Sequence, residues 1–330
     1  MIIVLYIFLF ILGFAALIKG ADFFVDGSSS LARTLKVPSL IIGLTVVAMG
    51  TSAPELAVST TAAIKEANEL ALSNVVGSNL FNLLVVLGFC AVIRPLLIEK
   101  SVLKRDYPFM IGITVLVFGA AGFKVLTSLG SFDFLHTPVL EDVGMLTRPF
   151  CIVLLVLFAA YIAMLIILAK KNKREDDGDE IKQLPLWKSL LLIVGGLALI
   201  VGGGQVVVYS AKEVARTFGM SETLIGLTVV ALGTSLPELV TSVVASRKGE
   251  NELAVGNVVG SNIFNLLLIL GVSGTVHPIA VNYASLIDLG ILIIASVATL
   301  IFSVTKKINR AEGIIMLLIY SGTITFAILR

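Results

Sequence analysis

The chain is 330 residues long, and 57% of its residues are hydrophobic while only 14% are charged. Soluble globular domains are about half apolar and about a quarter charged, so this composition and a mean hydropathy of +1.04 exclude a soluble domain. They predict an integral membrane protein whose main partner is the lipid bilayer. The net charge is only +2 and the sequence has no basic patch with interleaved aromatic residues, so we expect no nucleic-acid partner.

Ten apolar stretches follow one another along the chain, each roughly as long as a bilayer-spanning helix. The first twenty residues count among them, because they lack a basic leading region and their apolar core is too long for a signal peptide. The sequence therefore predicts an all-α integral membrane protein with ten transmembrane helices. The expected spans are residues 2–19, 39–64, 70–93, 107–123, 149–169, 188–208, 223–246, 253–276, 284–304 and 311–329.

A polar segment divides these spans into two sets of five. We expect a first five-helix repeat at 1–169, a cytoplasmic linker at 170–187 and a second five-helix repeat at 188–330. If the N-terminus is outside, 18 of the 24 basic residues lie on the cytoplasmic side, as the positive-inside rule favours. The expected location is the cell (plasma or inner) membrane, with both termini outside.

One long segment of the sequence occurs twice. Residues 43–88 and 226–271 align without a gap at a constant offset of 183, and about two-thirds of the aligned positions are identical. Such a repeat is typical of transporters built from two similar halves. Because each half has an odd number of spans, the second half must enter the membrane upside down. The sequence therefore predicts two inverted repeats related by an axis in the membrane plane.

Each copy of the repeat carries a proline and a carboxylate inside an apolar span. Residues 50–55 read GTSAPE, and residues 233–238 read GTSLPE. Pro54 lacks an N–H and clashes with the carbonyl four residues before it, so we expect the helix to break near Gly50. The break would free backbone carbonyls, including that of Ala48, which is tolerated at membrane depth only inside protein or beside a watery cavity.

The side chains around this break are rich in oxygen. Thr51 and Glu55 are four residues apart and share a helix face, with Ser52 beside them. Carboxylate, hydroxyl and carbonyl oxygens are the ligands that hard cations such as Na⁺ and Ca²⁺ prefer. Neither motif-bearing span contains Lys or Arg, so a bound cation is the simplest partner for the buried carboxylate. The second copy repeats the set with Ala231, Thr234, Ser235 and Glu238.

A second motif lies on the following span of each half. Residues 74–82 read NVVGSNLFN, and residues 257–265 read NVVGSNIFN. Ser78 and Asn82 share a helix face, and Gly77, like Gly260 in the second copy, would allow close backbone approach or local unwinding. A plainer interpretation remains open, in which the Ser, Thr and Asn side chains only hydrogen-bond helices together and the Gly and Pro residues only kink them.

These two motifs, each present twice and in the same order, resemble the α-repeats of the sodium/calcium exchanger family within the cation/calcium exchanger superfamily. The resemblance covers nearly the whole chain and is to short prokaryotic-type members. It implies cation sites at mid-membrane between the repeats, and a slide of spans 1 and 6 past the other helices. The residues it places at the ion site are Ala48, Thr51, Ser52, Glu55, Ser78, Asn82, Ala231, Thr234, Ser235, Glu238, Ser261 and Asn265.

One of these positions departs from some relatives. Where they carry Asp, this chain has Asn265, so the site would hold two acidic groups instead of three. In some relatives the Asp accompanies potassium co-transport, so Asn265 favours potassium independence.

The sequence thus predicts a secondary-active Na⁺/Ca²⁺ antiporter that works as a monomer, with Ca²⁺ and Na⁺ as transported ions, no cofactor and no enzymatic activity. A Ca²⁺/H⁺ antiporter using the same carboxylates is the nearest alternative, although proton-exchanging members of the superfamily typically have a different first motif without the GTSxPE sequence. A cation channel would normally place its symmetry between subunits, whereas here it lies within one chain. An intramembrane hydrolase would need a Ser–His or paired-Asp set, which the spans do not show.

Overall fold

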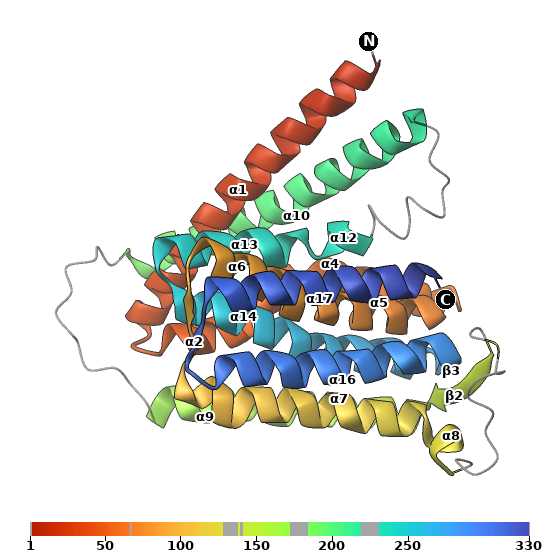
Figure 1. Cartoon of the computed structure of the whole chain (residues 1–330). Coiled ribbons are helices and arrows are strands. Elements are labelled where there is room, and N and C mark those ends of the chain that lie inside the picture. Colours follow the sequence, from red (N-terminus) through yellow and green to blue (C-terminus); the bar gives the residue numbers. More distant parts are fainter. Residues whose placement is uncertain are drawn as a thin grey trace. The chain divides into compact units, whose positions relative to one another are not determined.

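The computed structural model describes residues 2–66, 68–127, 138, 141–171, 184–218 and 231–329 (Figure 1). These residues form two compact units, and each unit draws on both halves of the sequence. Unit 1 comprises Met1–Pro54 and Leu165–Ser261, and unit 2 comprises Glu55–Met164 and Asn262–Arg330. The helix α9 (Arg148–Lys171) and the helix α14 (Asn251–Phe264) each contribute residues to both units.

The other elements among the described residues of unit 1 are helical. They are α1 (Ile2–Thr34), α2 (Ser39–Ile42), the π-helical η1 (Gly43–Val47), α3 (Ala48–Thr51), α10 (Leu186–Thr217), α12 (Ala231–Thr234) and α13 (Leu236–Lys248).

The described residues of unit 2 form helices and four short strands. Its first part contains α4 (Ala53–Ile64, from Glu55 on), α5 (Asn68–Leu80), the π-helical η2 (Phe81–Val86), α6 (Leu87–Ile93), β1 (Leu96–Leu97), the π-helical η3 (Val102–Asp106), α7 (Tyr107–Ala121), α8 (Phe123–Thr127) and β2 (Asp142–Leu146). Its second part contains the π-helical η5 (Asn265–Ile269), α15 (Leu270–Val276), β3 (Ile279–Asn282), α16 (Tyr283–Ser303), β4 (Lys307–Ile308) and α17 (Arg310–Leu329).

Seven helical spans among the described residues are long and apolar enough to cross a membrane, or eight if one bent pair counts as a single span. They coincide with eight of the ten expected spans, which confirms a helical multi-pass membrane protein. At the expected span 107–123 the structure has α7, which is only 15 residues long. The expected span 223–246 falls partly outside the described residues, and so does most of the expected linker 170–187.

The first helix is longer than expected. The predicted span ended at residue 19, whereas α1 continues to Thr34, and α10 likewise runs to Thr217 instead of 208. Hydropathy marks where an apolar stretch ends, but a helix continues for as long as its backbone bonds are made and its polar side chains find partners.

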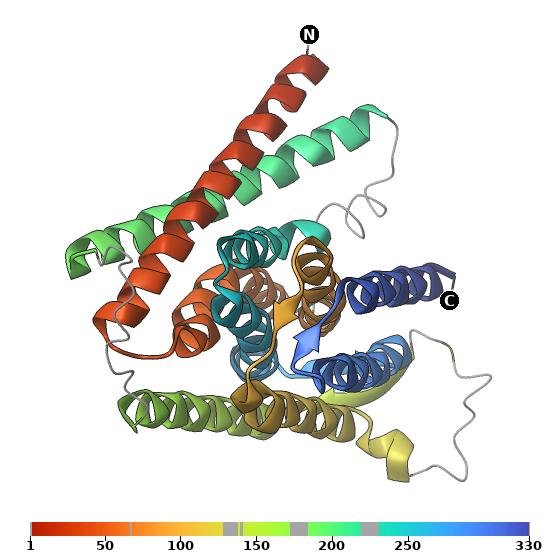
Figure 2. The ribbon, with the colours of Figure 1, turned by 60° about the vertical axis from the view of Figure 1, so that its left-hand side comes forward.

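The helices α1 and α10 lie side by side in unit 1 and run antiparallel (Figures 1 and 2). Glycines form their seam. A Cβ added to Gly20 would lie 2.7 Å from the carbonyl oxygen of Gly196, and one added to Gly13 would lie 3.0 Å from that of Gly203. Only residues without a side chain permit such close backbones, which is how membrane helices pack tightly.

The strands of unit 2 form two small antiparallel ladders. β1 pairs with β4, and β2 pairs with β3. Since β3 directly precedes α16 and β4 follows it, the two ladders lie at opposite ends of this 21-residue helix. The β2–β3 end is visible beside α16 and α7 in Figure 1.

Both proline motifs interrupt their helices as predicted. Ser52, between α3 and α4, has φ −84° and ψ 5°, and Ser235, between α12 and α13, has φ −92° and ψ 4°. The first interruption bends its helix pair by 49°. The break falls two residues after Gly50, because the missing N–H of Pro54 affects the carbonyl of Gly50 while the helix before that carbonyl stays intact.

Candidate cation site

In unit 1 the hydroxyl of Thr51 lies among acceptor oxygens. Its Oγ1 is 3.0 Å from Oδ1 of Asn257, 3.2 Å from the carbonyl oxygen of Val47 and 3.4 Å from that of Ala48. It is also 3.5 Å from Oγ of Ser261. A hydroxyl has one proton and can donate it to only one of these acceptors at a time. We call this fully buried group the Thr51 oxygen cluster. The expected freeing of the Ala48 carbonyl does not occur, because the backbone N–H of Ser52 donates to it at 3.0 Å.

The Glu238 carboxylate belongs to the same unit and is fully buried. It lies in the first turn of α13, where the positive end of the helix dipole favours a negative charge. Ser52 donates its hydroxyl to Oε1 at 2.9 Å, and no described residue donates a hydrogen bond to Oε2. A buried carboxylate with so little compensation is costly to ionise unless a positive charge joins it.

Asn257 fixes the direction of one oxygen in the Thr51 oxygen cluster. Its Nδ2 donates to Oγ of Ser242 at 2.9 Å and, at a longer 3.4 Å, to the carbonyl oxygen of Glu238. The amide therefore turns its oxygen toward Thr51. Asn257 and Ser261 are four residues apart on α14 and share one helix face.

Unit 2 contains the repeat-related arrangement. The Nδ2 of Asn74 donates to Oγ of Ser59 at 2.9 Å and lies 3.5 Å from the carbonyl oxygen of Glu55. These three residues precede Asn257, Ser242 and Glu238 by 183 positions each. The same local structure therefore surrounds both motif glutamates, and Glu55, like Glu238, is fully buried.

Two further predicted residues of unit 2 lie in π-helical turns. Asn82 is in η2 and Asn265 begins η5, and both are fully buried. Within the described part of the chain, neither polar atom of the Asn82 amide has a hydrogen-bond partner, nor does Oδ1 of Asn265. Such π-helical turns occur frequently at functional sites because they turn side chains and carbonyls away from the regular ladder.

The local unwinding considered at the motif glycines does not occur. The helix α5 is regular through Gly77, α14 is regular through Gly260, and the irregular π-helical turns follow one turn later. Close approach holds at Gly260, where an added Cβ would lie 2.8 Å from Cβ of Ala48. A Cβ added at Gly77 would have no atom of the described residues within 4 Å.

The predicted site residues are thus distributed over both units. In unit 1 the structure brings Thr51 into contact with Ala48 and Ser261, and Ser52 into contact with Glu238. Ser235 lies at the second helix break, Thr234 directly precedes it, and Ala231 begins α12. In unit 2 it buries Glu55, Ser78, Asn82 and Asn265. The supporting residues Ser59, Asn74, Ser242 and Asn257 were not predicted as site residues. The sequence could have indicated them, because Ser59 and Ser242, like Asn74 and Asn257, are identical residues at equivalent positions of the two copies.

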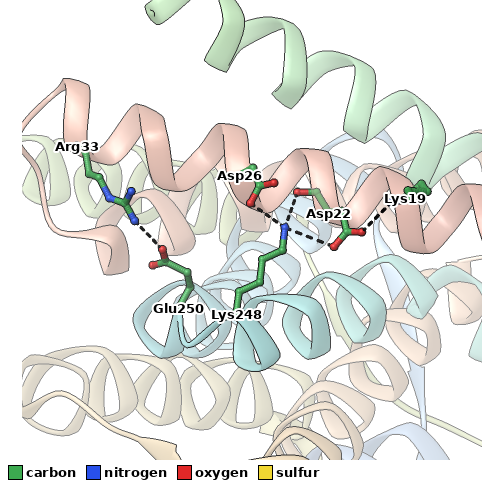
Figure 3. Close-up of polar contacts among 6 residues, drawn as sticks. All are labelled: Lys19, Asp22, Asp26, Arg33, Lys248 and Glu250. Atoms are coloured by element: carbon green, nitrogen blue, oxygen red, sulfur yellow. Dashed lines mark hydrogen bonds and ion pairs between the residues drawn. The ribbon is translucent and has the colours of Figure 1, made fainter. Parts of the chain in front are cut away.

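Charged contacts join α1 to the end of α13 and to Glu250, which follows α13 (Figure 3). Lys248 Nζ is 2.7 Å from Oδ1 of Asp26 and 3.4 Å from Oδ1 of Asp22, and Arg33 pairs with Glu250 at 2.9 Å. These side chains are partly exposed, so each pair contributes at most about 1 kcal/mol to stability. Through Lys248 they join α1 and α13 beyond the apolar stretch of α1.

Comparison with known proteins places this arrangement in a family. The model of the sodium/calcium exchanger protein family matches residues 5–167 and 188–329. The sodium/calcium exchanger MaX1 of Methanosarcina acetivorans is 37% identical over 348 residues, which cover 94% of this chain and 95% of that protein. The inner membrane protein YrbG of Escherichia coli is 34% identical over 324 residues, covering 93% and 92%.

A solved structure shows the same fold. The sodium-calcium exchanger NCX_Mj, soaked with Na⁺ and Sr²⁺, superposes with a TM-score of 0.80 at 29% identity, covering 98% of this chain and 99% of that one. These findings do not favour a channel or a hydrolase. The chain therefore belongs to the sodium/calcium exchanger family, and it is a multi-pass membrane antiporter of cations and not an enzyme.

Proposed function

We propose that this chain is a secondary-active antiporter that exchanges Na⁺ for Ca²⁺ by alternating access at a mid-membrane site. The observation that carries the proposal is the Thr51 oxygen cluster together with the buried Glu238 carboxylate beside Ser52. The names of the relatives MaX1 and NCX_Mj as sodium/calcium exchangers support the choice of ions.

The proposed ligands are oxygen donors of the two repeats. They are the side chains of Thr51, Ser52, Glu55, Ser78, Asn82, Thr234, Ser235, Glu238, Ser261 and Asn265 and the carbonyls of Ala48 and Ala231. Hard cations prefer such carboxylate, hydroxyl, amide and carbonyl oxygens. Two carboxylates balance the charge of one Ca²⁺ or of two Na⁺, so one site cannot hold both loads together. If Ca²⁺ and Na⁺ exclude each other from a site that opens to each side of the membrane in turn, the result is antiport.

The packing of α1 against α10 supports two repeats related by a twofold axis. The offset of 183 relates Gly13 to Gly196 and Gly20 to Gly203. If each residue is replaced by its counterpart in the other repeat, the contact of Gly13 with Gly203 becomes the contact of Gly196 with Gly20. The structure contains both contacts. Reciprocal contacts of this kind are the signature of twofold symmetry. We propose that this tightly packed pair moves as one body during alternating access.

The strand ladders support the inversion of the second repeat. Leu96 in β1 and Ile279 in β3 are related by the same offset, yet the ladders that contain them lie at opposite ends of α16. Equivalent connections at opposite ends of a spanning helix are what an inverted repeat requires. We accordingly propose ten spans with both termini outside, in a protein that works as a monomer.

Competition between the two cations tests the proposal on purified protein. Ca²⁺ binding is measured by isothermal titration calorimetry at constant pH and ionic strength while Na⁺ replaces choline. The apparent Kd for Ca²⁺ should rise with Na⁺ more steeply than in direct proportion, because more than one Na⁺ displaces each Ca²⁺. Ca²⁺ binding that responds to pH but ignores Na⁺ would contradict the proposal and favour the Ca²⁺/H⁺ alternative.

A further inference from the structure

Two asparagines of unit 2 make a reciprocal contact. Asn79 donates Nδ2 to the carbonyl oxygen of Asn262 at 3.2 Å, and Asn262 donates Nδ2 to the carbonyl oxygen of Asn79 at 3.3 Å. The two residues are related by the repeat offset of 183, and both are buried. A residue that contacts its own repeat partner lies on the axis that relates the repeats, so this pair marks where the axis passes through unit 2.

The reciprocal contact dictates how a neighbouring amide faces. A backbone carbonyl can only accept, so the NH₂ group of Asn79 must face Asn262 and its Oδ1 must face away. That Oδ1 accepts a hydrogen bond from Nδ2 of Asn265 at 2.9 Å. The amide of Asn265 therefore turns its NH₂ group toward Asn79 and leaves its oxygen on the opposite side. This oxygen is buried and has no hydrogen-bond partner in the described part of the chain.

We propose that Asn79 is a positioning residue for cation binding, which holds the amide of Asn265 so that its oxygen and not its NH₂ group faces the cation. The inference rests on the proposed function, in which Asn265 is a ligand. A carboxylate would present oxygen in either orientation, whereas an asparagine has only one oxygen. Half a turn of the Asn265 amide would direct N–H groups, with their positive partial charge, at the ion.

The other half of the pair provides an internal comparison. The repeat-related bond would join Nδ2 of Asn82 to Oδ1 of Asn262, and both atoms lack a hydrogen-bond partner among the residues described. Among the residues described, the Asn79 side chain thus bonds both Asn262 and Asn265, whereas the Asn262 side chain bonds only Asn79. Substitutions at Asn79 and Asn262 therefore each remove one of the two equivalent amide-to-carbonyl bonds, but only a change at Asn79 releases Asn265.

The experiment compares Asn79→Leu with Asn262→Leu, since leucine has the branched shape and the number of heavy atoms of asparagine but no polar atoms. Ca²⁺ affinity is measured by calorimetry, and thermal unfolding in detergent is followed for both variants. Both variants should lose stability, and Asn79→Leu should lose more, because it also removes the bond from Asn265. Only Asn79→Leu should weaken Ca²⁺ binding further, by about fivefold, the effect of losing one neutral hydrogen bond. Asn79→Ala serves as a second variant if the leucine side chain prevents folding.

A double-mutant cycle separates positioning from general damage. Asn265→Ala alone should weaken Ca²⁺ binding, and adding Asn79→Leu to it should have no further effect on affinity. Equal losses of affinity in Asn79→Leu and Asn262→Leu, or a loss that persists in the Asn265→Ala background, would overturn the inference. Wild-type affinity in Asn265→Ala would overturn it as well. None of these results would affect the competition between Na⁺ and Ca²⁺ in the wild-type protein, so failure of the inference and failure of the proposed function are distinguishable.

Discussion

Replacing Glu238 by glutamine removes one negative charge from the proposed cation site and changes little else. The side chain is fully buried, and its Oε1 accepts a hydrogen bond from Ser52 at 2.9 Å. The amide oxygen of glutamine can accept the same bond, so the Ser52 contact is kept. The loss is confined to the charge of the carboxylate, which no described residue compensates at Oε2.

The expected loss of Ca²⁺ affinity is large. Two unit charges about 4 Å apart interact by about 4 kcal/mol at an effective dielectric constant of about 20, and the double charge of Ca²⁺ doubles that figure. The hydration that each ion gives up offsets much of this attraction. We expect a net loss of at least about 3 kcal/mol, which corresponds to more than about 100-fold weaker Ca²⁺ binding. Na⁺ has half the charge and should lose less, so the variant should shift selectivity toward Na⁺.

Calorimetry on purified protein and Ca²⁺ uptake by proteoliposomes measure the two consequences, with Glu250→Gln as a matched control. Glu250 pairs with Arg33 on the partly exposed surface of unit 1, so the same chemical change there should lower stability by at most about 1 kcal/mol and leave Ca²⁺ binding unchanged. If Glu238→Gln binds Ca²⁺ as tightly as the wild type, or if both variants lose affinity equally, the assignment of Glu238 as a ligand is refuted.

Three further predictions concern charge movement, proton competition and helix packing. Transport should be electrogenic if more than two Na⁺ enter per Ca²⁺, because the membrane potential then does work of about 2.3 kcal/mol per net charge per 100 mV. A Ca²⁺ uptake rate that does not change with the clamped potential would contradict this stoichiometry. Asn265→Asp should make Ca²⁺ uptake fall more steeply as the pH is lowered from about 8.5 to about 6, because a third buried carboxylate makes protons compete with cations; an unchanged pH profile would place residue 265 outside the site. Gly20→Leu should destabilise the protein by about 1–3 kcal/mol or more, since its Cβ would lie 2.7 Å from the carbonyl oxygen of Gly196. Gly202→Leu, whose Cβ would meet no atom of the described residues within 4 Å, should leave the thermal unfolding temperature nearly unchanged. Equal shifts in both variants would contradict the packing of α1 against α10.

The features that the sequence predicts well depend on local chemistry. Spans follow from runs of apolar residues, and the break at Ser52 follows from the missing N–H of Pro54. The repeat of the motifs also indicates which polar side chains matter, because Thr51 and Glu238 combine polarity with an apolar setting. Each of these properties is determined by residues close together in the sequence.

The features that the sequence does not predict depend on contacts between distant residues. Beyond its apolar stretch α1 contacts partners such as Lys248, more than 200 positions away. The π-helical turns at Asn82 and Asn265 carry no signal of their own in the sequence. The direction of the Asn265 amide follows from Asn79 and Asn262, and only the fold brings these three residues together.

The central claim is that Na⁺ and not H⁺ drives Ca²⁺ across the membrane. The most direct measurement is ⁴⁵Ca²⁺ uptake into proteoliposomes that contain the wild-type protein, with an imposed Na⁺ gradient and the pH on both sides clamped by an ionophore. The account predicts uptake that follows the direction and size of the Na⁺ gradient and continues under the pH clamp. Uptake that stops when the pH is clamped, and that a proton gradient restores without Na⁺, would contradict it.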